Sequence, residues 1–179
     1  MSKRLFLLRH ALAIPQSGGG DIKRALSPKG KEDAAALGEL MLNQNYLPDI
    51  ILCSPAVRTR QTLEGLQQHI ATPNLTSPKI LYNGSAGDYL HEIQKTSDEH
   101  KNILIIAHNP SIYELVILLV MQEDNSQMQR LSEGYEPATL SVISCKCDKW
   151  ADIKPAENEL AYITDPMDYN APARPTRWM

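Results

Sequence analysis

The sequence predicts a three-layer α/β/α sandwich built around a mostly parallel central sheet. Three short apolar runs, at residues 5–8, 50–53 and 103–107, have the composition of buried strands. Helical patterns of apolar residues follow each run, and such alternation is typical of a parallel sheet with helices on both faces. Each run ends on polar residues, so we expect these side chains to meet at one edge of the sheet.

The elements of the first half follow this alternation. Residues 3–9 are expected to form a strand, and a loop follows whose most flexible point is Gly18-Gly19-Gly20. Ser27-Pro28 has the pattern of a helix start, with serine as the N-cap and proline at the first helical position. Ser54-Pro55 repeats this pattern after the second strand and predicts a helix to about residue 70.

The second half predicts shorter elements with more polar connections. We expect, in order, a short strand at 80–82, a helix at 87–95, a strand at 102–107, a helix at 111–121, a polar loop at 122–136, a strand at 138–147 and an edge strand at 160–164. A single domain over residues 1–165 and a loose tail over residues 166–179 complete the expected organisation.

Composition narrows the classes of function. A chain of 179 residues is long enough for one domain with its own core, and its net charge of −3 argues against a nucleic-acid binder. Three cysteines give no disulfide framework and fit a reducing compartment. The apolar run near the start is too short for a signal peptide, and residues 116–121 are too short to cross a bilayer. We therefore expect a cytoplasmic protein without a membrane partner.

Polar residues at the ends of the three runs suggest chemistry on a phosphate. Arg9 and His10 follow the first run, and His108 follows the third. Arg58 and Arg60 lie in the first turn of the helix expected after the second run, where the helix dipole also favours anions. Guanidinium groups match phosphate oxygens, and histidine acts as a nucleophile or proton carrier at neutral pH. Arg58 and Arg60 point to different sides, so at most one of them faces the ligand.

Four segments, in this order, resemble the histidine phosphatase superfamily. They are Leu7–Ala11, Asp21–Gly30, Ser54–Thr62 and Ile106–Pro110. The short bacterial phosphohistidine phosphatases of the SixA type are the closest match, because the chain has their length and lacks a large inserted cap. The resemblance covers residues 4–145 and implies a phosphoglycerate mutase-like fold.

The resemblance implies a role for each matching residue. His10 is the nucleophile and becomes phosphorylated, while Arg9, Arg58 and His108 surround the transferred phosphoryl group. Arg24 matches an additional arginine of the SixA-like pattern and is expected to bind substrate. The family does not require an arginine at the position of Arg60. No metal and no other cofactor are expected, because phosphoryl transfer of this kind needs positioning and electrostatic stabilisation.

Two features depart from the family pattern. Ala11 replaces a glycine that follows the nucleophile, so the backbone there need not adopt a conformation restricted to glycine. Larger relatives place a glutamate after their third strand as general acid, and residues 82–88 offer no clear equivalent. Asp21 is the candidate general acid, and Asp88 is a second candidate.

A missing acid favours a phosphoramidate substrate, because an imidazole leaving group can carry its own proton. We therefore expect a phosphatase acting on phosphohistidine in proteins. Two alternatives stay open: a small-molecule phosphomonoesterase that uses the same site, and a non-catalytic phosphate-binding protein. The expected partner is a phosphorylated protein or a small phosphate ester.

Overall fold

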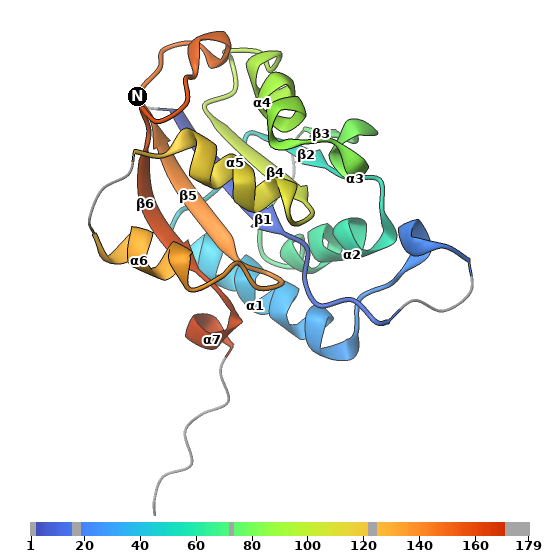
Figure 1. Ribbon diagram of the computed structural model, residues 1–179. Helices are drawn as coiled ribbons and strands as arrows, with labels where there is room; N and C mark the ends of the chain where they lie inside the picture. Colours follow the sequence, from blue (N-terminus) through green and yellow to red (C-terminus); the bar gives the residue numbers. More distant parts are fainter. Residues whose placement is uncertain (1–2, 16–18, 72–73, 122–124, 171–179) are drawn as a thin grey trace, which may run out of the picture.

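The computed structural model describes residues 3–15, 19–71, 74–121 and 125–170. Within these residues the strands form one six-stranded sheet in the order β3-β2-β4-β1-β5-β6 (Figure 1). The strands are β1 (Lys3–Arg9), β2 (Ile50–Cys53), β3 (Leu75–Thr76), β4 (Asn102–Ala107), β5 (Leu140–Cys145) and β6 (Glu159–Thr164).

The sheet is mostly parallel, as the sequence predicts. β1, β2, β3 and β4 run in the same direction, whereas β5 and β6 are antiparallel to their neighbours. β1 lies between β4 and β5, with Leu7 opposite Ile105 on one side and Ser141 on the other. The carboxyl ends of β1, β2 and β4 therefore meet at one edge.

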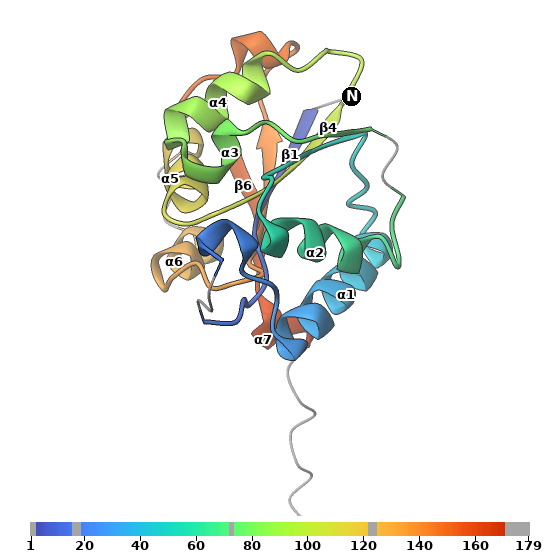
Figure 2. The ribbon, with the colours of Figure 1, turned by 90° about the vertical axis from the view of Figure 1, so that its right-hand side faces the viewer.

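Helices cover both faces of the sheet, which gives the predicted three layers (Figure 2). One face packs against α1 (Pro28–Asn43), α2 (Val57–Leu66) and α7 (Pro166–Tyr169). The other face packs against α3 (Ile80–Asn83), α4 (Ala86–Gln94), α5 (Ser111–Leu119) and α6 (Ser126–Ser132). There are also two 3₁₀ turns in the described residues, η1 (Asp21–Lys23) and η2 (Trp150–Asp152), and Trp150 of η2 is buried in the core beside α4 and α5.

Burial on both faces explains why β1 is apolar at every position from Leu5 to Leu8. Side chains alternate along a strand, so Leu5 and Leu7 join the core beside α4 and α5, and Phe6 and Leu8 join the core beside α1 and α2. All four side chains are fully buried. The charged residues of this central strand therefore lie at its two ends, at Lys3 and Arg4 and at Arg9.

The two predicted helix caps behave differently. The side chain of Ser27 accepts a hydrogen bond from Gly30 N at 3.0 Å, which confirms the cap of α1. The expected cap by Ser54 is wrong, because α2 begins at Val57 after Ala56 and has no side-chain cap bond. The Ser54 hydroxyl instead contacts His108 at 2.7 Å.

Three other expectations differ from the structure. Residues 80–82 form part of α3 and not a strand, because local bonds such as Tyr82 N to Lys79 O satisfy their backbone, while the edge strand lies at Leu75–Thr76. The polar loop expected at 122–136 contains α6, which Asn125 caps. The loose tail expected from residue 166 instead begins with α7, whose Tyr169 hydroxyl donates to Ala138 O. Residues 171–179 lie outside the described part of the chain.

Candidate functional site

The carboxyl edge of the sheet holds a pocket of about 460 Å³. β1 delivers Arg9 and His10 to it, β4 delivers His108, and the first turn of α2 delivers Arg58. The loop that carries η1 lies beside the N-terminus of α2 (Figure 1) and adds Asp21 and Arg24. The lining residues are Arg9, His10, Asp21, Arg24, Arg58, Tyr82, Asn83, His108 and Asn109.

The partners of its two ring nitrogens fix the tautomer of His10. Nδ1 lies 2.7 Å from Ala11 O, which can only accept, so Nδ1 carries the proton. Nε2 lies 3.2 Å from Arg58 Nε, which can only donate, so Nε2 presents its lone pair. Burial lowers the pKa of His10 to about 4 and outweighs the hydrogen bond to Ala11, and Arg58, Arg9 and Arg24 lower it further. The ring is therefore neutral at neutral pH, with Nε2 as its nucleophilic atom.

Arg58 connects His10 to the loop at η1. Besides its contact with His10, it donates from Nη1 to Asp21 O at 2.8 Å and from Nη2 to Asp21 Oδ2 at 2.9 Å. Its side chain is 7% exposed, whereas that of Asp21 is 41% exposed. The guanidinium thus lies deep in the pocket and the carboxylate lies at its mouth.

Asp21 accepts from three donors. Arg24 Nη1 donates to Oδ1 at 3.1 Å. The Tyr82 hydroxyl donates to Oδ2 at 3.0 Å, and this oxygen also accepts the bond from Arg58. Desolvation raises the pKa of Asp21, but the hydrogen bonds from Arg24, Tyr82 and Arg58 outweigh it and lower the pKa to about 2. An ionised carboxylate has no proton to give at neutral pH, which argues against Asp21 as the general acid.

His108 lies beside His10, with 5.2 Å between the ring centroids. Its Nε2 contacts the Ser54 hydroxyl at 2.7 Å, and Tyr82 packs edge-on against its ring at 88°. Its Nδ1 is buried and has no hydrogen-bond partner in the described part of the molecule. Burial lowers the pKa of His108 to about 3, and the charge of Arg58 adds to this effect. His108 is therefore neutral at neutral pH.

Arg9 is held by a segment of the chain far from Asp21 in sequence. Its Nη1 donates to Tyr135 O at 2.6 Å, and Asn109 Nδ2 donates to the same oxygen at 3.0 Å. Its Nε is buried without a partner among the described atoms. A buried donor without an acceptor is costly, so this position suits a ligand that supplies oxygen atoms.

Comparisons with known proteins agree with this arrangement. The family model of the histidine phosphatase superfamily (branch 1) matches residues 5–80. Among solved structures, a protein of Nakamurella multipartitia assigned as the phosphohistidine phosphatase SixA is 28% identical, with a TM-score of 0.82 over 93% of this chain and 97% of that one. A protein of Agrobacterium tumefaciens with the same assignment is 25% identical, with a TM-score of 0.78 over 93% of this chain and 99% of that one.

The chain is similar to the histidine phosphatase superfamily, whose model matches its N-terminal part. Its fold is phosphoglycerate mutase-like, and its structure is similar to those of SixA-type members. An uncharacterised protein of Mycobacterium tuberculosis, Rv1276c, is 29% identical over 150 residues, which cover 83% of this chain and 92% of that protein. Similarity to this superfamily and to the SixA-type structures supports phosphatase activity.

Ala11 occupies the position that follows the Arg-His pair, where the resembling family has glycine. It is fully buried against Leu26, Ala34 and Ala138, so its methyl group fills a small apolar cluster. Its backbone N donates to Thr62 Oγ1 at 3.0 Å, and this hydroxyl donates to Arg58 O at 2.8 Å. Thr62 therefore ties the segment after β1 to the helix that carries Arg58.

The structure separates the predicted site residues into two groups. Arg9, His10, Arg24, Arg58 and His108 all line the pocket, as does the candidate acid Asp21. Arg60 is exposed and lies outside the lining set, and Asp88 caps α4 by accepting from Ser85 N at 2.8 Å. The predicted flexible point includes Gly18, which lies outside the described residues, whereas Gly19 and Gly20 have the positive φ angles of 121° and 88° that glycine permits.

The sequence patterns give no site role to three residues that line the pocket, Tyr82, Asn83 and Asn109, or to Ser54 and Thr62, which bond to site residues. These patterns predict Ser54 as a helix cap and Tyr82 as part of a strand. Ser54 and Thr62 lie within a segment that resembles the family, and this segment was the available signal for them. No sequence signal pointed to Tyr82, because its hydroxyl reaches Asp21 across 61 positions of the chain.

The described residues include no group of three or more His, Cys, Asp or Glu side chains that could hold a metal ion. Cys53 and Cys145 are buried, and burial raises the pKa of each thiol to about 12. Across the described ranges, no helix is both long and apolar enough to cross a membrane.

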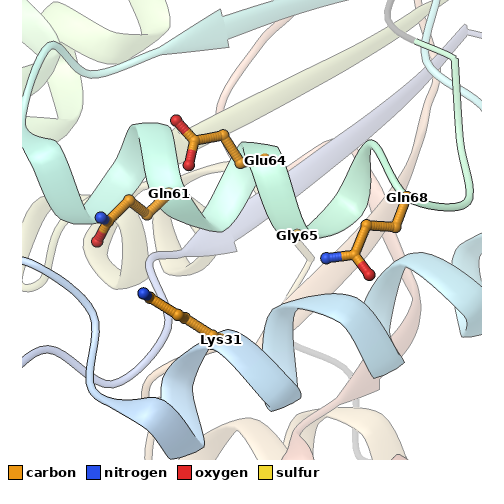
Figure 3. Close-up of a pocket in the computed structure, with 5 residues that line it drawn as sticks. All are labelled: Lys31, Gln61, Glu64, Gly65 and Gln68. Atoms are coloured by element: carbon orange, nitrogen blue, oxygen red, sulfur yellow. The ribbon is translucent and has the colours of Figure 1, made fainter.

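A second hollow of about 160 Å³ lies between α1 and α2 (Figure 3). Its lining is Lys31, Gln61, Glu64, Gly65 and Gln68. Its lining has neither histidine nor arginine, whereas the residues predicted for phosphoryl chemistry line the pocket at the sheet edge.

Proposed function

We propose that this protein is a phosphatase that removes the phosphoryl group from phosphohistidine in other proteins, through a phosphohistidine intermediate on His10. The observation that carries the proposal is the fixed lone pair on His10 Nε2, in a pocket lined by Arg9, Arg24 and Arg58. A neutral imidazole held in this tautomer is a nucleophile, and the arginines supply donors for phosphoryl oxygens.

The reaction proceeds in two displacements. In the first, His10 Nε2 forms a bond to phosphorus while the bond from phosphorus to the substrate nitrogen breaks, and the substrate imidazole leaves with its proton. In the second, water attacks phosphorus, the bond to His10 Nε2 breaks, and inorganic phosphate is released. Arg58 Nε must leave His10 Nε2 before attack, and the phosphoryl oxygens offer it acceptors of greater charge.

The state of the carboxylates supports a phosphoramidate substrate over an alkyl ester. Of the described residues that line the pocket, Asp21 alone has a carboxylate, and its pKa is lowered to about 2. Asp88 is engaged in its capping box at the start of α4. An alkyl ester needs a proton for its leaving oxygen, whereas a protonated imidazole needs none. The SixA assignments of the two similar structures point to the same substrate class.

The test compares kcat/KM for a phosphohistidine-bearing protein domain with that for sugar phosphates, phosphoserine peptides and an aryl phosphate. We expect the phosphohistidine domain to be the best substrate, because an uncapped pocket gives a small leaving group few contacts. Higher efficiency with a small ester would favour a metabolite phosphomonoesterase. Binding of phosphate without turnover of any substrate would favour a non-catalytic phosphate-binding protein.

A further inference from the structure

We infer that Asp21 is a built-in counter-anion that limits how tightly the phosphoryl site holds phosphate. This inference rests on the proposed function, since it concerns the same pocket. Asp21 lies in the 3₁₀ turn η1, and its carboxylate and backbone oxygen hold the arginines that would bind a phosphoryl group.

The contacts of Asp21 resemble those that an oxyanion would make. One carboxylate oxygen accepts from Arg24 at 3.1 Å, and the other accepts from Arg58 at 2.9 Å and from Tyr82 at 3.0 Å. The backbone oxygen of the same residue accepts a further bond from Arg58 at 2.8 Å. Asp21 is thus the negative partner of two of the three arginines that line the pocket, whereas Arg9 interacts with the charge of Glu136, which does not line the pocket.

The fixed charges of the pocket match those of a phosphoryl group. Three guanidinium groups and one carboxylate leave a charge of +2, provided that both histidines are neutral. Burial keeps them so, since it lowers the pKa of His10 to about 4 and that of His108 to about 3. A phosphoryl group carries roughly −1.5 to −2 at neutral pH. Without Asp21 the pocket would hold an excess positive charge over its ligand.

A charge balance of this kind favours turnover. Inorganic phosphate is the product, and it keeps every oxygen contact that the substrate phosphoryl group makes. A site with three uncompensated arginines would retain it, whereas Asp21 opposes retention through its negative charge and by accepting hydrogen bonds from Arg24 and Arg58. The substrate is then distinguished from the product by its remaining contacts outside the pocket.

The alternative explanation gives Asp21 a purely structural role. Asp21 would then only hold Arg58 and Arg24 in place, and removing it would disorder two phosphate ligands. That role predicts weaker phosphate binding in a variant, whereas the counter-anion predicts tighter binding. The sign of the change therefore separates the two explanations.

The experiment measures the binding of inorganic phosphate to the full chain by calorimetry at neutral pH. The variants are Asp21→Asn and Asp21→Ala, which both remove the charge but differ in the contacts that they keep. We expect both to bind phosphate about tenfold more tightly than the unmodified protein, as removal of one unit charge at this range allows. Phosphate should also become a stronger competitive inhibitor of turnover by a similar factor.

Asp148→Asn is the matched control, because Asp148 is exposed and follows β5 at the opposite edge of the sheet. It removes the same charge and should leave phosphate affinity unchanged. Weaker binding in both Asp21 variants, or equal tightening in Asp148→Asn, would overturn the counter-anion. If the unmodified protein bound no phosphate and Arg58→Ala changed nothing, the proposed function itself would fail.

Discussion

His10 and His108 follow neighbouring parallel strands, yet the protein holds their rings in different ways. Each hydrogen-bond partner of the His10 ring has a single possible role, since Ala11 O can only accept and Arg58 Nε can only donate. His108 contacts the hydroxyl of Ser54, which can both donate and accept, and its other nitrogen has no partner among the described atoms. One ring has a fixed proton, and the other has a proton that can occupy either nitrogen.

Under the proposed function, this difference would give two equivalent positions of the sheet separate chemical tasks. A nucleophile must keep its lone pair on one atom, and the contacts of His10 ensure this. A group that supports a developing charge benefits from switching between donor and acceptor, and a serine partner allows this. We therefore expect that changes at His10 abolish activity and that changes around His108 lower kcat only partly. The following predictions test that order.

The largest effect is expected for His10→Ala. Loss of the nucleophile should lower kcat by about 10⁴-fold or more. Mass spectrometry after quenching without acid should find the phosphoryl adduct on residue 10 of the unmodified protein and none in the variant. His69→Ala is the control, because His69 is exposed and lies outside the pocket. Full activity in His10→Ala would remove His10 from the mechanism.

Arg58→Ala should have the next largest effect, a loss of roughly 10²–10³ in kcat, because it removes a donor to the phosphoryl oxygens. Arg58→Lys should restore little activity, since lysine lacks the planar fork that contacts His10 and Asp21 together. Arg60→Ala lies two residues away on the same helix, and its exposed side chain should be dispensable. Comparable losses in Arg58→Ala and Arg60→Ala would indicate a general charge effect.

Ser54→Ala should have a moderate effect. It leaves His108 Nε2 without its buried partner, and the loss of one such bond should lower kcat by roughly 5- to 100-fold. The adduct on His10 should still form, because the contacts of His10 are intact. Ser77→Ala serves as control, since the Ser77 hydroxyl bonds only the backbone of Cys53. An undiminished kcat in Ser54→Ala would show that His108 needs no fixed orientation.

The smallest effect near neutral pH is expected from pH itself. Burial and the nearby arginines lower the pKa of His10 from 6.5 to about 4, so its lone pair persists well into acid. We expect the acid limb of kcat/KM to lie near pH 4, with a flat profile at pH 6–7. Because the unfolded chain binds this proton more readily, the free energy of unfolding should decrease as pH falls from 6.5 towards 4. An acid limb close to pH 6.5 would contradict a buried, neutral His10.

The sequence was sufficient to predict the sheet and most residues at its functional edge. Apolar runs that are followed by Arg9-His10 and His108 locate the sheet edge, because the apolar stretch of a buried parallel strand gives way to polar side chains where the strand ends. The helix start at Ser27-Pro28 depends on local geometry and was predicted for the same reason.

The contacts that the sequence could not give are those made between distant segments. Ser54 has the local pattern of a cap, but its hydroxyl bonds a residue 54 positions away. Tyr82 and Asp21 lie 61 positions apart, and neither has a sequence pattern that indicates the other. The acid role expected for Asp21 also depends on distant contacts, because the protonation state of a carboxylate is set by the donors that the fold brings to it.

The close approach of α1 and α2 has a mechanical consequence for the site. A Cβ atom at Gly65 would lie 2.5 Å from Ala34 Cβ, and one at Gly38 would lie 2.9 Å from Leu66 Cα. α2 is a rigid rod that carries Arg58 in its first turn, so the spacing of the two helices also sets how far the guanidinium reaches. We expect a methyl group at either glycine to push α1 and α2 apart and thereby to displace Arg58. Gly38 and Gly65 thus influence the width of the pocket through the spacing of the two helices, although neither glycine lines the pocket.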